Sequence, residues 1–73
     1  MTSLHVCYSI PVVINAPTEL ANEIIDARTG FEIDKALKKI KALCVEVQPA
    51  LKYYDDVAVI EDIFLEETDE KIY

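Results

Sequence analysis

Eight of the last nineteen residues are acidic, and their carboxylates are the groups in this chain best suited to chemistry. A pair of carboxylates works as general acid and base only where a pocket raises the pKa of one of them, and so short a segment builds no walled pocket. A calcium loop needs a glycine turn among its acids, and this stretch has no glycine. Two interpretations stay open: a solvated acidic face, and a surface that binds a basic partner. The eight residues are Asp55, Asp56, Glu61, Asp62, Glu66, Glu67, Asp69 and Glu70.

The single histidine and the two cysteines form no recognisable catalytic or metal-binding set. His5 and Cys7 would lie on the same side of a strand, about 7 Å apart at the backbone, which is too far for cysteine–histidine catalysis. A structural zinc site needs four ligands. The only glycine, Gly30, cannot make a glycine-rich phosphate loop. We therefore expect no enzyme, no cofactor and no metal, and we expect Cys7 and Cys44 to be reduced thiols.

The net charge of −7 is distributed unevenly along the chain. Residues 1–34 carry −4, residues 35–52 carry +4 and residues 53–73 carry −7. The five lysines of the middle segment suit the solvated side of an amphipathic helix. Phosphate groups and anionic lipids repel so acidic a chain. We therefore expect a protein partner with a basic surface, rather than nucleic acid or a membrane.

Apolar residues at every second position from Leu4 to Ile14 predict one long β-strand with a buried face. Pro11 cannot donate a hydrogen bond to a neighbouring strand, so we expect an edge strand or a bulge. Residues 57–65 fit a helix or a strand, and their β-branched content favours the strand. The N-terminal strand needs a pairing partner, which is either residues 57–65 or the same strand of a second copy.

Two amphipathic helices are predicted between these segments. The first begins in the cluster Asn15–Glu19 and ends near Arg28, where Gly30 would cap it. The second begins near Ile33 or Asp34, because apolar residues recur three and four positions apart from there onward.

The second helix is expected to break at Pro49, which must kink it or restart it. Its apolar stripe continues beyond the proline as far as Tyr54. We therefore place Tyr54 in the core and Tyr53 at an interface, where tyrosines are enriched.

Residues 1–65 are expected to form a single small α+β domain, followed by an acidic tail at residues 66–73. The domain would hold an N-terminal edge strand, two to three amphipathic helices and, if residues 57–65 form a strand, a C-terminal strand. A core of this size supplies only about 3–5 kcal/mol, so we expect a dimer. The N-terminus has no basic residue before Arg28 and no apolar run of membrane-spanning length, which predicts a cytoplasmic protein.

Two short stretches within residues 10–45 resemble ribbon-helix-helix proteins. Val12–Leu20 (VVINAPTEL) is similar to the strand-to-helix junction of that family, and Gly30–Leu37 (GFEIDKAL) is similar to its turn and second helix. The resemblance implies a DNA-binding N-terminal dimer and, as in the many members that are antitoxins, an acidic C-terminal arm that wraps a toxin. Residues 36–54 also look like the helical hairpins of small phage proteins of unassigned role.

These observations predict a non-catalytic protein-binding module, a small acidic inhibitor of the phage anti-defence or antitoxin type that captures its partner stoichiometrically. The alternatives are a ribbon-helix-helix DNA-binding autorepressor and a virion or assembly subunit. Apolar side chains interleaved with acids are typical of an interface. The predicted partner-binding residues are Tyr53, Asp55, Asp56, Glu61, Asp62, Ile63, Phe64, Glu66 and Glu67.

Overall fold

The alternating apolar residues near the N-terminus form a β-hairpin in the computed structural model, which describes residues 3–54 and 56–73. β1 (Ser3–Tyr8) and β2 (Val13–Pro17) pair in antiparallel orientation. The chain reverses between them around Pro11. Our prediction of one long strand is therefore wrong.

The pairing register explains why the apolar spacing did not reveal the turn. Val6 lies opposite Ile14 and Leu4 lies opposite Ala16, so paired residues share the same parity. Even-numbered side chains consequently face one side on both strands, as they would on a single straight strand. Pro11 fixes its φ angle and has no N–H to lose, which suits a reversal.

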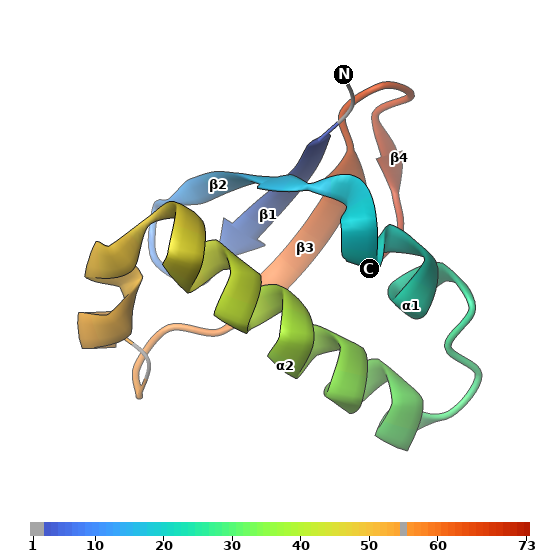
Figure 1. The fold of residues 1–73 in the computed structure, drawn as a ribbon, viewed down its shortest axis with the longest axis horizontal. Helices are drawn as coiled ribbons and strands as arrows, with labels where there is room; N and C mark the ends of the chain where they lie inside the picture. The colour runs from blue at the N-terminus through green and yellow to red at the C-terminus, as the bar shows by residue number, and fades with distance from the viewer. Residues whose placement is uncertain (1–2, 55) are drawn as a thin grey trace.

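Four antiparallel strands form one sheet in the order β2-β1-β3-β4 (Figure 1). β3 (Ile60–Leu65) lies within residues 57–65, so that segment is a strand in the sheet. β1 lies between β2 and β3. The first half of the predicted edge strand is therefore central, and its second half, β2, lies at an edge of the sheet. β4 (Glu70–Lys71) forms the opposite edge, so two of the residues expected to form an acidic tail are part of the sheet.

The helical segments are α1 (Ala21–Ile25) and α2 (Gly30–Val47), with two short 3-10 turns, η1 (Thr18–Leu20) and η2 (Pro49–Tyr54). The first helix ends before Arg28, earlier than predicted. Pro49 restarts the helical course after α2, which confirms one of the two alternatives for this proline. No helix in the part of the chain that the structure describes is long and apolar enough to cross a membrane.

Gly30 begins α2 and does not cap the first helix, which corrects our prediction. The Thr29 hydroxyl accepts a hydrogen bond from the Glu32 N–H at 3.1 Å. The Glu32 carboxylate accepts one from the Arg28 N–H at 3.3 Å. A threonine followed three residues later by a glutamate satisfies the unpaired N–H groups of a helix start, so α2 begins earlier than its apolar stripe indicated.

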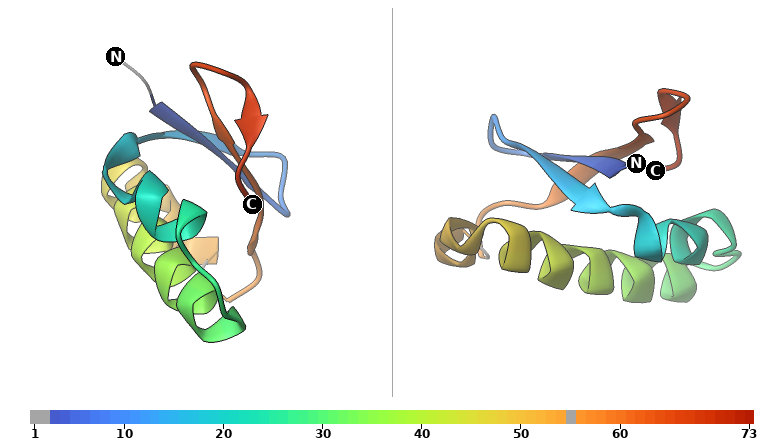
Figure 2. Two further views of the ribbon diagram at one scale, coloured as in Figure 1. Left: turned by 90° about the vertical axis from the view of Figure 1, so that its right-hand side faces the viewer. Right: turned by 45° about the horizontal axis from the view of Figure 1, so that its top comes forward.

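Both α-helices cover the same face of the sheet and leave the opposite face open (Figure 2). The core lies between the covered face and α2, and each aliphatic side chain buried there contributes about 1.5–3 kcal/mol. Tyr54 ends η2 at the surface and is half exposed, so its predicted place in the core is wrong. The α+β class is confirmed. The largest fully buried side chains are Leu4, Val6, Ile40, Cys44 and Ile63.

Candidate functional site

The end of η2 and the connector from it to β3 expose four large apolar side chains within seven residues. Tyr53 is 88% exposed and Val57 is 71% exposed, and about half of Tyr54 and of Val59 is exposed. Asp56 lies among them and is also exposed. Four large exposed apolar side chains so close together in the sequence, with an acid among them, indicate an interaction surface. We call Tyr53, Tyr54, Asp56, Val57 and Val59 the connector surface.

Backbone hydrogen bonds hold the connector in place. The Tyr54 carbonyl accepts hydrogen bonds from the Val57 N–H at 3.1 Å and the Ala58 N–H at 2.8 Å. Ser9 and Val59 are joined twice: the Ser9 N–H donates to the Val59 carbonyl at 2.8 Å, and the Val59 N–H donates to the Ser9 hydroxyl at 3.1 Å. Tyr54, Val57 and Val59 therefore stand on a hydrogen-bonded backbone, which lowers the entropy cost of binding.

A shallow apolar groove borders the connector surface. It lies between the β1–β2 turn and η2, and Tyr54 belongs to both the groove and the connector surface. Apart from one glutamine amide, its side chains are apolar or aromatic, so it suits an apolar side chain of a partner. The groove is lined by Ile10, Pro11, Val12, Gln48, Ala50, Leu51 and Tyr54.

β3 separates the predicted partner-binding residues onto different sides. Ile63 lies opposite Val6 and is fully buried. Our assignment of Ile63 to a partner surface is therefore wrong, because alternate side chains of a strand point to opposite faces. Asp62 and Phe64 lie on the open face of the sheet, and Glu61 is exposed where the register between β1 and β3 shifts.

The β3–β4 turn gathers further carboxylates at the far end of β3. Glu66 is tied to β1, because its N–H donates to the Ser3 carbonyl at 3.0 Å and its carboxylate accepts a hydrogen bond from the Ser3 hydroxyl. The bond from the Ser3 hydroxyl lowers the pKa of Glu66 below its ordinary value. Glu67, Asp69 and Glu70 are exposed, and Asp69 has a left-handed backbone with a φ of 56°.

The predicted residues thus do not form one surface: some lie at either end of β3, Asp62 and Phe64 lie on its open face, and Ile63 lies in the core. This strand has six residues and is about 20 Å long. Tyr53 and Asp56 lie at its beginning, whereas Glu66 and Glu67 lie beyond its end; Asp55 lies outside the described residues. In the described part of the chain, no three histidine, cysteine or acidic side chains gather where a metal ion could be held. The arrangement suits contact with a macromolecule.

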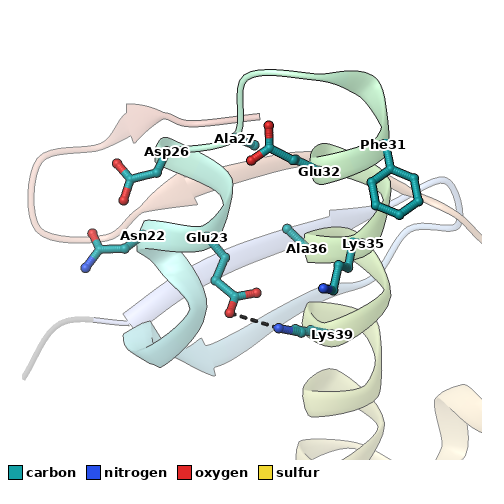
Figure 3. Close-up of a pocket in the computed structure, with 9 residues that line it drawn as sticks. All are labelled: Asn22, Glu23, Asp26, Ala27, Phe31, Glu32, Lys35, Ala36 and Lys39. Carbon is teal, nitrogen blue, oxygen red and sulfur yellow. Dashed lines mark hydrogen bonds and ion pairs between the residues drawn. The ribbon is translucent and has the colours of Figure 1, made fainter.

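A separate cleft lies between α1 and α2 (Figure 3). Glu23 of α1 and Lys39 of α2 face each other across it and form an ion pair of 3.0 Å. Both side chains are partly exposed, so solvent screens this pair and its contribution to stability is small. Glu23 and Lys39 are therefore already paired with each other across the cleft.

Sequence reasoning missed three apolar residues that the structure leaves exposed. Phe31 is 79% exposed and falls outside the spacing of the apolar stripe of α2, and this offset is a signal of exposure. Val57 and Val59 flank the buried Ala58, and their alternation with it is a similar signal.

Comparison with known proteins found no matching protein-family model, no matching curated protein and no matching solved structure. Its function must therefore be inferred from its own surfaces.

Proposed function

We propose that this chain is a non-catalytic protein-binding module that captures one partner protein stoichiometrically. The observation that supports this proposal is the connector surface, where exposed tyrosines and valines stand on a hydrogen-bonded backbone. A few aromatic side chains commonly supply most of the binding free energy of an interface. Tyr53 is the most exposed of them and is the expected anchor.

The charge of the chain indicates the class of partner. The net charge is −7, and exposed carboxylates occur both in the connector surface, at Asp56, and around the β3–β4 turn. Such a field attracts a basic surface and accelerates the encounter with it. The proposed partner is therefore a protein with a basic surface, of the kind that binds nucleic acid.

An inhibitor is the form of this function that we favour. An acidic protein bound over a basic channel blocks that channel to phosphate groups, which is how an inhibitor of the antitoxin or phage anti-defence type would act. The resemblance to antitoxins points the same way. Cys7 and Cys44 are free thiols, which suits action in a reducing cytoplasm.

Capture from cell lysate tests the proposal. A tagged full-length chain is incubated with nuclease-treated lysate of its source or host cells, and bound proteins are identified by mass spectrometry. We expect one dominant partner in equimolar amount. The double substitution Tyr53→Ala and Val57→Ser should abolish the capture, because it removes the apolar contacts of the connector surface.

Phe31→Ala is the matched control, since it removes an equally exposed aromatic ring from the beginning of α2. This variant should capture the partner as the unchanged chain does. Equal capture by the double variant, or equal losses in both variants, would contradict the proposal.

A further inference from the structure

β2 presents hydrogen-bonding groups that its own sheet does not use. The Tyr8 N–H donates to the Val12 carbonyl at 3.1 Å, and pairs in an antiparallel ladder alternate between hydrogen-bonded and non-hydrogen-bonded. The next hydrogen-bonded positions of β2 are therefore Ile14 and Ala16. The N–H and C=O groups of Val13 and Asn15 point away from β1, toward the open edge.

This edge has few of the features that normally prevent strands from pairing, and its one proline, Pro17, stands at its end. Exposed edges are usually short, charged or bulged. β4, the opposite edge, has two residues, Glu70 and Lys71, and both are charged. β2 has five residues and no charge, and Val13 is 59% exposed.

The edge is also accessible to another chain. A surface depression lies at the end of this edge, from Asn15 to Glu19, and its walls also include Ser3 of β1 and Val47 of α2. Asn15 and Pro17 are exposed on β2 within this depression. No other described residue hydrogen-bonds to the outward backbone groups of Val13 and Asn15.

We propose that β2 pairs in antiparallel orientation with β2 of a second copy, which makes one continuous sheet across a two-fold axis. Antiparallel pairing of a strand with itself is self-complementary, so each copy supplies the groups that the other needs. The strand is uncharged, so no like charges face each other directly when two chains of net charge −7 meet along it. This inference is independent of the capture of a partner protein.

Sedimentation of the full chain over roughly a hundredfold range of concentration tests the pairing. We expect the mass to rise from 8.3 kDa toward twice that value. Asn15→Pro removes an outward N–H without touching the ladder with β1, and it should remain monomeric. Asn15→Thr keeps the N–H and should dimerise like the unchanged chain.

The circular dichroism spectrum of Asn15→Pro checks that it folds. If it does not, Val13→Lys replaces it, because a charge on the edge also opposes pairing. A monomer at every concentration, or a folded edge variant that dimerises as well as the unchanged chain, would overturn the inference.

Salt separates this inference from the proposed function. Raising the salt from about 50 mM to about 500 mM screens the repulsion between two acidic copies and should strengthen the dimer. The same change should weaken the binding of a basic partner. A dimer that persists in a chain that captures no protein would overturn only the proposed function, and capture by a strict monomer would overturn only the pairing.

Discussion

At the scale of single residues, burial decides the reactivity of the two thiols. Cys7 is half-buried and lies on the open face, whereas Cys44 projects from α2 into the core and is fully buried. Burial raises the pKa of the Cys44 thiol, and a hydrogen bond with Tyr8 offsets only part of this rise. Because the thiolate is the reactive form, Cys44 should be inert in the folded chain.

A thiol reagent should therefore modify Cys7 at least about 100-fold faster than Cys44, since Cys44 reacts only when the core opens. Mass spectrometry of partly labelled protein gives both rates. In denaturant the two rates should become similar, and Cys7→Ser should leave only the slow reaction in the native chain. Comparable native rates would show that the core does not shield Cys44.

The bond between Ser3 and Glu66 should make stability depend on pH. The pKa of Glu66 is lower in the folded chain, so the bond stabilises the fold above the unfolded pKa of about 4.3 and is lost as the pH falls through the folded value. Ser3→Ala should lower the unfolding temperature at neutral pH, and the difference should shrink as the pH falls below the unfolded pKa of about 4.3. A difference that is constant over this range contradicts the assignment.

At the scale of elements, spacing predicted which residues are buried better than it predicted where the chain turns. The stripe of α2 correctly indicated Ala36, Ile40 and Cys44 as core residues. The alternation near the N-terminus correctly indicated its buried face. The alternation could not locate the hairpin. Even-numbered residues of β1 pair with even-numbered residues of β2, so the apolar alternation continues through the turn unchanged.

The start of α2 should depend on its capping residue. Thr29→Ala removes the acceptor of the Glu32 N–H and should lower the free energy of unfolding by about 1 kcal/mol. Thr18→Ala is the control, because it changes a threonine at the start of η1, which has no side-chain cap. Equal losses in denaturant titrations of the two variants would mean that the Thr29 cap adds nothing.

The candidate site could be predicted as a segment of sequence but not as a surface. The acids and Tyr53 indicated the C-terminal third of the chain, where the connector surface and the acidic turn lie. The inclusion of Ile63 was wrong because the register between β1 and β3 decides which side chains of β3 face outward. A shift of one residue would exchange the two faces, and a single sequence does not specify that register.

At the scale of the whole molecule, the lysines of α2, the connector surface and the acidic β3–β4 turn lie on different parts of the surface. Lysines of α2 lie on the helical side, where Lys38 pairs with Asp34 at 3.3 Å and Lys39 pairs with Glu23. The connector surface lies at one end of β3 and the acidic turn at the other. In the proposed dimer the connector surface occurs twice, so a partner with two sites would bind with increased avidity.

The most direct test of the connector surface is the dissociation constant of the captured partner, measured by calorimetry for the unchanged chain, Tyr53→Ala and Phe31→Ala. We predict that Tyr53→Ala raises the constant by at least about tenfold, because it truncates the expected anchor of the interface. Phe31→Ala should leave it within about twofold. An unchanged constant for Tyr53→Ala would contradict the role of the connector surface in binding.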